Sequence, residues 1–350
     1  MVAPLNWGLG HATRCIPIIK ALLQHDFDVL IASDGMALAL LRQEFPHLDH
    51  VVLPGYDIHY SKKRQNLRLE LIKQAPKIAR AIMREKAMIE KLLTQDRIDG
   101  IISDNRFGVR HKAIPCVFMT HQIRVLSGWT TSITTFVQRQ IIRKFDECWV
   151  PDHSYSDNMS GVMSHGITSG IPTKYIGILS RMTKQCVPAT YDLLLLLSGP
   201  EPQRSLFEQK LISSLSDSTK QILMVRGIVS NHVTKQKFGA IEAVNHLPTH
   251  ALEKVINATK LIVCRSGYSS IMDLAALGKK AFLVPTPGQY EQEYLAQKFK
   301  DEQKAPFCRQ EDFIASMLSE SDRYKGLGYS NRGEDHFNDW SLLFGIFQGK

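Results

Sequence analysis

The stretch "LIVCRSGYSSIMDLAALGKKAFLVPTPGQYEQEYLA", Leu261 to Ala296, decides the fold class. It predicts a buried strand that ends at Cys264, a turn "RSGYSS", a helix that begins near Ser269, and a second strand that ends at Pro285. Two strands joined by a helix run parallel, with the helix across one face of their sheet. The stretch therefore predicts an α/β protein.

The same alternation of strands and helices extends along the rest of the chain. Helical stretches separate the strand-like runs, and we expect a long helix over 66–95, interrupted at Pro76. The alternation stops over 181–191 and then restarts, so it predicts two doubly wound parallel-sheet domains joined by a linker. The predicted parts are a domain over 1–180, a linker over 181–191, a domain over 192–325 and an apolar, helical tail over 326–350.

Composition narrows the class of protein. The chain has 350 residues, of which 44% are hydrophobic, and six cysteines without a C-x-x-C pair. This pattern argues against a zinc site and a disulfide framework and predicts a cytoplasmic protein. No apolar run reaches about 18 residues, so no transmembrane helix is expected. The chain turns polar at Asn6, which argues against a signal peptide, and the short first strand suggests that a few residues are missing upstream.

A net charge of +9 indicates an anionic partner. Basic residues gather in "SKKRQNLR", Ser61 to Arg68, without interleaved aromatic residues or a nucleic-acid motif. A solvated basic helix and a patch for an anionic membrane both remain open. Under the second hypothesis, the docking residues are Lys62, Lys63, Arg64 and Arg68.

The N-terminal turn "NWGLGHATR", Asn6 to Arg14, joins the first strand to a helix. Gly8 and Gly10 allow positive φ and close approach to the backbone, and a helix start attracts negative charge. Pro17 is expected in the first helical turn, where proline is tolerated. Ordinary turn chemistry explains the same residues, so the turn alone does not establish a site.

The turn after Cys264 carries a clearer pattern. Ser266 and Ser269 can cap the helix or bind phosphate oxygens, and Gly267 permits close backbone approach. Asp273 lies one helical turn beyond Ser269, within reach of a ribose. The segment "TPGQYEQEY", which follows the next strand, supplies amides and carboxylates that could bind sugar hydroxyls. Two ordinary capped turns are the alternative.

At this point the sequence resembles a known family. The block Cys264–Ala296 resembles the donor-binding region of GT-B glycosyltransferases, in particular the family 28 group of lipid-I N-acetylglucosaminyltransferases. The turn Asn6–Arg14 resembles that group's first glycine-rich loop, and "LSGPEPQR", Leu197 to Arg204, stands in the place of the second. The resemblance implies a GT-B fold with two Rossmann-like domains facing a cleft. It also implies a nucleotide-sugar donor on the C-terminal domain, an acceptor on the N-terminal domain, no cofactor or metal, and a tail that packs back on the N-terminal domain.

Residues carry over from this family by position. The turn after Cys264 meets the diphosphate, Asp273 replaces the usual glutamate on the ribose, and the loop after residue 244 faces a uracil base. Gln292 and Glu293 replace the usual glutamine pair on the donor sugar, which leaves the identity of the sugar open. The implied donor-binding residues are Gly8, Gly10, Ser198, Gly199, Asn245, His246, Leu247, Arg265, Ser266, Gly267, Tyr268, Ser269, Asp273, Gln289, Gln292 and Glu293.

An inverting transferase needs a base for the acceptor hydroxyl. His11, at the start of a helix, stays neutral because the positive end of the helix disfavours imidazolium, and a neutral imidazole is a competent base. Asp104 and His121, which follow the fourth and fifth strands, are the rival bases. Each of the three has a plainer alternative role in capping a loop.

The predicted function is that of a metal-independent, inverting glycosyltransferase. It would move a hexose or N-acetylhexosamine from a UDP-sugar to a glycolipid or saccharide of the cell envelope. It would work in the cytoplasm, on the inner face of the membrane. A UDP-sugar hydrolase or epimerase is the alternative, and a nucleotide- or nucleic-acid-binding module without catalysis is a third hypothesis. No nucleic-acid partner is expected.

Overall fold

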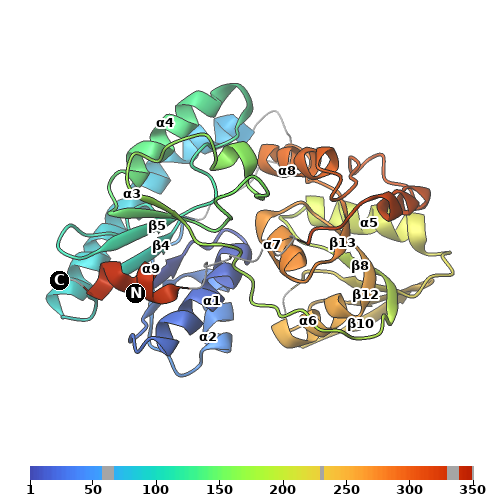
Figure 1. Cartoon of the computed structure of the whole chain (residues 1–350), viewed down its shortest axis with the longest axis horizontal. Coiled ribbons are helices and arrows are strands. Elements are labelled where there is room, and N and C mark those ends of the chain that lie inside the picture. The colour runs from blue at the N-terminus through green and yellow to red at the C-terminus, as the bar shows by residue number, and fades with distance from the viewer. Residues whose placement is uncertain (57–66, 229–231, 329–338, 349–350) are drawn as a thin grey trace. The chain divides into compact units, whose positions relative to one another are not determined.

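The structure is a computed structural model that describes residues 1–56, 67–228, 232–328 and 339–348, without the side chains of 67–75. The chain divides into two compact units. Unit 1 is Met1–Leu179 together with the C-terminal segment that begins at Asn331, and unit 2 is Ser180–Ser330. Both are α/β units (Figure 1).

The described strands of unit 1 form one parallel sheet with the order β3-β2-β1-β4-β5-β6-β7. Its strands are β1 (Val2–Pro4), β2 (Ile31–Ser33), β3 (His50–Val52), β4 (Ile101–Asp104), β5 (Cys116–Met119), β6 (Glu147–Val150) and β7 (Thr173–Tyr175). Its helices are α1 (Gly10–Gln24), α2 (Gly35–Glu44), α3 (Leu67–Thr94), α4 (Thr131–Ile142) and α9 (Trp340–Gln348), with short 3-10 helices η2 (Gly128–Thr130) and η3 (Gly161–Met163).

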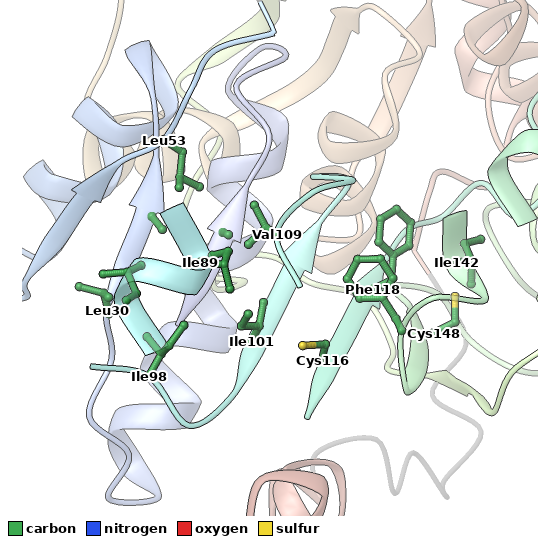
Figure 2. Close-up of a cluster of buried hydrophobic side chains, with 14 of the residues drawn as sticks. Leu30, Leu53, Ile89, Ile98, Ile101, Val109, Cys116, Phe118, Ile142 and Cys148 are labelled. Atoms are coloured by element: carbon green, nitrogen blue, oxygen red, sulfur yellow. The ribbon is translucent and has the colours of Figure 1, made fainter. Parts of the chain in front are cut away.

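Continuous apolar runs place the central strands inside unit 1. Every residue of β4 and of β5 is buried, as expected for parallel strands covered on both faces. Figure 2 shows one side of this core, where Ile89 of α3 and Ile98 lie near Ile101 of β4, and Phe118 of β5 lies near Cys148 of β6. Burial of these side chains supplies the main driving force for folding of the unit.

Two helices of unit 1 differ from or extend the expectation from sequence. The prediction that the long helix is interrupted at Pro76 is wrong, because α3 continues through this proline. The apolar helix α9, red in Figure 1, packs on unit 1. Phe344 of this helix is fully buried and makes edge-on ring contacts with His25 and Phe27. The centroid of the Phe344 ring lies 6.3 Å from that of Trp149. Aromatic contacts thus tie the C-terminal segment to elements near the start of the chain.

The described strands of unit 2 form a second sheet with the order β10-β11-β9-β8-β12-β13. The strands are β8 (Tyr191–Leu196), β9 (Ile222–Val225), β10 (Lys235–Phe238), β11 (Ile241–Val244), β12 (Thr259–Cys264) and β13 (Lys280–Leu283). The helices are α5 (Gln203–Leu215), α6 (Thr249–Asn257), α7 (Tyr268–Ala276) and α8 (Tyr290–Asp301), followed by the 3-10 helix η4 (Ala315–Arg323).

All pairs in this sheet are parallel except β10 with β11. The strand β10 is not predicted from the sequence, because "KQKF" is polar and mostly exposed and shows no apolar pattern. The predicted unit from Leu261 to Pro285 is present as β12, α7 and β13. Among the described residues, no helix has the length and apolar character needed to cross a bilayer.

Candidate functional site

The topology of each sheet marks one place for a ligand. In unit 1, β1 lies between β2 and β4, and the winding direction reverses between β1 and β4. In unit 2, the corresponding reversal lies between β8 and β12. Ligands of doubly wound sheets bind beyond the carboxyl ends of the strands at this reversal. We call these two places the unit 1 edge and the unit 2 edge.

The unit 1 edge carries a cluster of buried charged groups, built by the pairing of β1 with β4. Pro4 pairs with Asp104, so the turn after β1 and the end of β4 lie together. The Arg14 Nε donates to the Asp104 Oδ2 at 2.7 Å, and the Arg14 Nη2 donates to Oδ1. The His11 Nδ1 lies 3.0 Å from the same Oδ1. The His121 Nδ1 lies 3.0 Å from the Arg14 Nη1.

Burial and charge set the pKa values in this cluster. Burial by itself would raise the pKa of Asp104, but Arg14 and His11 outweigh it and hold that pKa well below its usual range. Burial lowers the pKa of His11, Asp104 opposes this effect, and Arg14 adds to it. The structure therefore favours a charged Asp104 beside a neutral His11.

A neutral His11 carries one ring proton, either on Nδ1 or on Nε2. Its Nδ1 lies 3.0 Å from the Asp104 Oδ1 and 2.9 Å from the Arg14 Nη2, and a single ring nitrogen can satisfy only one of them. We assign the proton to Nδ1, because the charged carboxylate is the stronger acceptor. The lone pair then lies on Nε2, which forms no hydrogen bond with the described residues.

The three candidate bases thus meet in one cluster with different surroundings. Asp104 is fully buried and both of its oxygens accept from Arg14, an arrangement that suits a partner of His11 better than a base. His11 is 15% exposed at its side chain. Arg14 was missed, although it stands three residues after His11, a spacing that places both on one helix face.

The start of α1 differs from the predicted turn. Gly8 has φ +77° and does need glycine, whereas Gly10 is the first residue of the helix and does not have a positive φ. His11 is therefore in the first helical turn, which contains no acidic residue. The expectation that Pro17 lies in the first turn is wrong, because the helix begins seven residues earlier, at Gly10.

The unit 2 edge brings together the loops that follow β8, β12 and β13. Gly199, with φ +103°, lies beside Thr286, whose Oγ1 would be 3.8 Å from an added Cβ. The Ser266 Oγ donates to the Gln292 carbonyl at 2.7 Å, which connects the loop after β12 to α8. These contacts place the predicted glycine loop, the "RSGYSS" turn and the "TPGQYEQEY" segment side by side.

Several side chains predicted to hold the donor also brace these loops. Arg265 is buried, and its guanidinium donates to the carbonyls of Val284, Pro285 and Gln203. The Gln292 Oε1 accepts from the Thr286 N–H at 2.8 Å, and its Nε2 donates to Gln289. The Glu293 Oε1 accepts from the Gly288 N–H at 3.0 Å. Tyr268 is buried as well.

Open space remains at the start of α7. Gly267 precedes the helix with no side-chain cap, and nothing lies within 4 Å of a Cβ built on it. The first N–H groups of a helix lack partners inside the helix. Ser198 and Gly199, which follow β8 in the sequence, are exposed. The Thr286 Oγ1 is buried without a hydrogen-bond partner among the described residues.

The loop after β11 is the predicted contact for the uracil of the donor, and several polar groups of this loop bond within the protein. The Asn245 side chain bonds to the backbone of His232 and Thr234, its N–H donates to Thr234, and its carbonyl accepts from Ile228. Asn245 thus holds the loop rather than presenting its backbone. His246 and Leu247 are half-buried.

Asp273 already has a partner. The Ser180 Oγ donates to its Oδ1 at 2.7 Å, and Ser180 is the first residue of unit 2. Burial raises the pKa of Asp273 to about 6, although Ser180 and Arg181 act in the opposite direction.

The predicted basic residues Lys62, Lys63 and Arg64 lie outside the described residues, as does the side chain of Arg68.

Comparison with known proteins gives a family match within unit 2 and a shared fold for the whole chain. Residues 201–322 match the glycosyltransferase family 28 C-terminal domain. A search of curated protein sequences finds no significant match.

Solved structures share the fold at low sequence identity. The glycosyltransferase of kitacinnamycin has a TM-score of 0.61 at 12% identity, over 99% of this chain and 93% of its own. UGT89C1 of Arabidopsis thaliana has a TM-score of 0.61 at 10% identity, over 99% and 92%. MurG of Acinetobacter baumannii has a TM-score of 0.52 at 16% identity, over 91% and 88%. The predicted fold class is confirmed, and the family match and the fold together identify the chain as a glycosyltransferase of GT-B fold with a family 28 C-terminal domain at residues 201–322.

Proposed function

We propose that the protein transfers a hexose or N-acetylhexosamine from a UDP-sugar to a hydroxyl of a glycolipid or saccharide acceptor, with inversion and without a metal. The observation that carries this proposal is the pair of His11 and Asp104. A neutral imidazole with its proton on Nδ1, facing a buried carboxylate, leaves Nε2 free to take a proton. This is the group that an attacking hydroxyl needs.

The unit 2 edge supports a diphosphate and not a proton transfer. The groups there that suit an anion are the backbone amides at the start of α7, beside the open space at Gly267, and the Thr286 hydroxyl. Helix N-termini bind phosphate groups through such amides. Among the described residues no group of three or more His, Cys, Asp or Glu side chains is arranged to hold a metal ion. We assign the diphosphate to backbone amides and hydroxyls of this edge.

In this proposal Asp273 accepts hydrogen bonds from the ribose hydroxyls, which replace the hydrogen bond from Ser180. The resemblance of MurG and the matched family 28 domain support a MurG-like group and a lipid-linked acceptor of the cell envelope. The enzyme would then act at the inner face of the membrane. During transfer, the acceptor held at the unit 1 edge must reach the donor held at the unit 2 edge.

The donor assignment can be tested by thermal unfolding. We expect UDP to raise the melting temperature more than ADP or GDP does, also in EDTA, since ligand at 100 times Kd adds about 2.7 kcal/mol. Asp273→Ala should weaken UDP roughly ten- to a hundredfold, because it removes a charged hydrogen-bond partner worth about 1.5–3 kcal/mol. Glu311→Ala, an exposed residue of unit 2, is the control.

Three outcomes would contradict parts of the proposal. If no uridine nucleotide changes the melting curve, the donor site is wrong. If Asp273→Ala binds UDP as tightly as the parent, the ribose assignment is wrong. If the protein releases free sugar from UDP-sugars without any acceptor, a hydrolase replaces the transferase.

A further inference from the structure

The helix α4 has its polar and apolar faces reversed. Its buried residues are Thr135, Gln138 and Ile142, so two of the three are polar. Ile133, Phe136 and Val137 are exposed by 63%, 63% and 50%. A helix on the surface of a globular protein normally buries its apolar side chains and exposes the polar ones. This helix therefore leaves apolar side chains at the surface of the unit.

Specific hydrogen bonds hold the reversed orientation. The Val125 N–H donates to the Thr135 Oγ1 at 3.1 Å, and the Thr134 Oγ1 donates to the Val125 carbonyl at 3.2 Å. The Gln138 Nε2 donates to the Gln122 carbonyl at 3.4 Å. Rotation of α4 to bury its apolar residues would break these bonds and leave buried polar groups unsatisfied. The apolar face is therefore fixed outward.

The exposed surface continues beyond α4. Trp129 of η2, just before α4, is 78% exposed. With Ile133, Phe136 and Val137 it forms a surface that we call the α4 stripe. Figure 1 shows α4 along an outer side of unit 1. Such apolar surface, larger than a single scattered side chain, is typical of an interaction site.

The segment that carries the α4 stripe has charged residues of one sign only. No Asp or Glu occurs from His121 to Phe145, whereas Arg124, Arg139, Arg143 and Lys144 do. Arg143 and Lys144 are exposed at the end of the helix. Amphipathic helices that lie in a membrane interface combine Trp, Phe and aliphatic side chains on one side with Arg and Lys beside them. Anionic lipids attract such basic residues by about 1 kcal/mol each.

We infer that the α4 stripe docks the protein on an anionic lipid bilayer, with the helix in the plane of the interface. Trp129, Ile133, Phe136 and Val137 enter the boundary between headgroups and acyl chains, and Arg143 and Lys144 meet lipid phosphates. The connection from β5 to α4 also carries His121 of the base cluster. The docking surface and the unit 1 edge thus share one short segment. The inference rests on the proposed function only for its purpose, which is to bring a membrane-bound acceptor to His11.

Vesicle sedimentation without any substrate tests this inference. The probes are phosphatidylcholine vesicles with and without phosphatidylglycerol. We expect at least tenfold stronger binding to the anionic vesicles, and at least tenfold weaker binding for the triple variant Ile133→Ser, Phe136→Ser, Val137→Ser. Leu342→Ser is the matched control, because Leu342 is an apolar residue of unit 1 that is 72% exposed on another helix.

A charge variant separates the two contributions. Arg143→Gln with Lys144→Gln should weaken binding at low salt and flatten its salt dependence, since surface charges are screened by salt. Lys220→Gln with Lys237→Gln, two exposed residues of unit 2, should have no such effect. Thermal stabilisation by UDP is measured on every variant, so that failure of docking and failure of the donor site are distinguished.

Two results would overturn the inference. One is equal vesicle binding by the triple variant and the parent. The other is a dimer in sedimentation velocity that the triple variant dissociates, which would assign the α4 stripe to contact between two copies of the chain.

Discussion

The unit 1 edge and the unit 2 edge occupy equivalent places in two similar sheets, yet their chemistry differs. At the unit 1 edge, a carboxylate, a guanidinium and two imidazoles contact one another. At the unit 2 edge, most groups are neutral amides and hydroxyls, the buried Arg265 binds mainly carbonyls, and Asp273 bonds to Ser180. A doubly wound sheet can thus present either a proton acceptor or anion-binding groups, depending on the residues that follow its strands.

The pKa directions of the two aspartates express the same difference. Arg14 and His11 overcome burial at Asp104 and lower its pKa, whereas burial prevails at Asp273 and raises its pKa to about 6. Asp104 is thus charged wherever the protein is folded near neutral pH. Asp273 becomes charged only at a cost, which a ligand that donates hydrogen bonds to it would reduce.

The largest expected effect concerns proton transfer at the unit 1 edge. His11→Ala should lower kcat about 10²–10⁴-fold, because it removes the proposed general base. Binding of UDP, measured by thermal shift, should be unchanged, since the proposed donor site lies on unit 2. His50→Ala, an exposed histidine of β3, is the control. Full activity of His11→Ala would end the proposed division of roles.

The activity of the parent should also depend on pH in a defined direction. Burial lowers the pKa of His11 from its usual value of 6.5. The acid limb of the kcat/KM profile should therefore lie below pH 6.5, since the base fails only when it is protonated. An acid limb above pH 6.5 would contradict a neutral His11 in the folded protein.

The next effect concerns stability at the unit 1 edge. Asp104→Asn leaves the buried Arg14 without its carboxylate and should cost about 3–5 kcal/mol in the free energy of unfolding. The matched control is Asp192→Asn, which breaks the exposed pair of Asp192 with Lys260 and should cost about 1 kcal/mol at most. Urea unfolding measures both. Similar costs for the two variants would show that burial of the cluster is energetically unimportant.

The sign should reverse at the unit 2 edge. The folded pKa of Asp273 is raised from 3.8 to about 6, so its charged form destabilises the folded state, and at 1.36 kcal/mol per pH unit the effect reaches about 3 kcal/mol. Asp273→Asn should therefore stabilise the protein at pH 7.5 while it weakens UDP. As pH falls from 6 to 4, the folded parent takes up a proton that the unfolded chain does not, and its disadvantage disappears. Loss of stability in Asp273→Asn at pH 7.5 would refute this account.

The smallest effect compares two glycines of the unit 2 edge. Gly199→Ala forces an alanine into φ +103° and should cost about 1–2 kcal/mol. Gly267→Ala has φ −73° and open space around its Cβ, so stability should change by less than about 1 kcal/mol. If the open space is the diphosphate site, Gly267→Ala should nevertheless weaken UDP. Unchanged UDP affinity would place the diphosphate elsewhere.

Much of the fold could be predicted because continuous apolar runs identify buried parallel strands. The positions of Asp104 and His121 at strand ends followed from the same runs. The order of the strands could not be predicted, because it depends on packing between segments far apart in sequence, such as the pairing of Pro4 with Asp104. The partners of charged groups depend on that order, so the pairing of Arg14 with Asp104 and of Ser180 with Asp273 could not be anticipated.

Local sequence patterns do not show the tertiary contacts that form some parts of the structure. The strand β10 lacks an apolar pattern, and its backbone pairing with β11 compensates for this. The prediction that Gln292 and Glu293 contact the sugar rests on their amide and carboxylate groups, and it does not include the bonds that these groups make within the chain. In the folded chain these groups bond to Thr286 and Gly288 of their own loop.

This bracing of the loop after β13 has a practical consequence for anyone who wishes to redirect the enzyme to another sugar. Exchange of Gln292 or Glu293 alone would alter the shape of the loop before it altered recognition, because each side chain holds a backbone N–H of the loop. A more promising unit of exchange is the whole segment from Thr286 to Glu293, transplanted between related chains as one cassette. Its two ends join a buried strand and a helix that would stay in place.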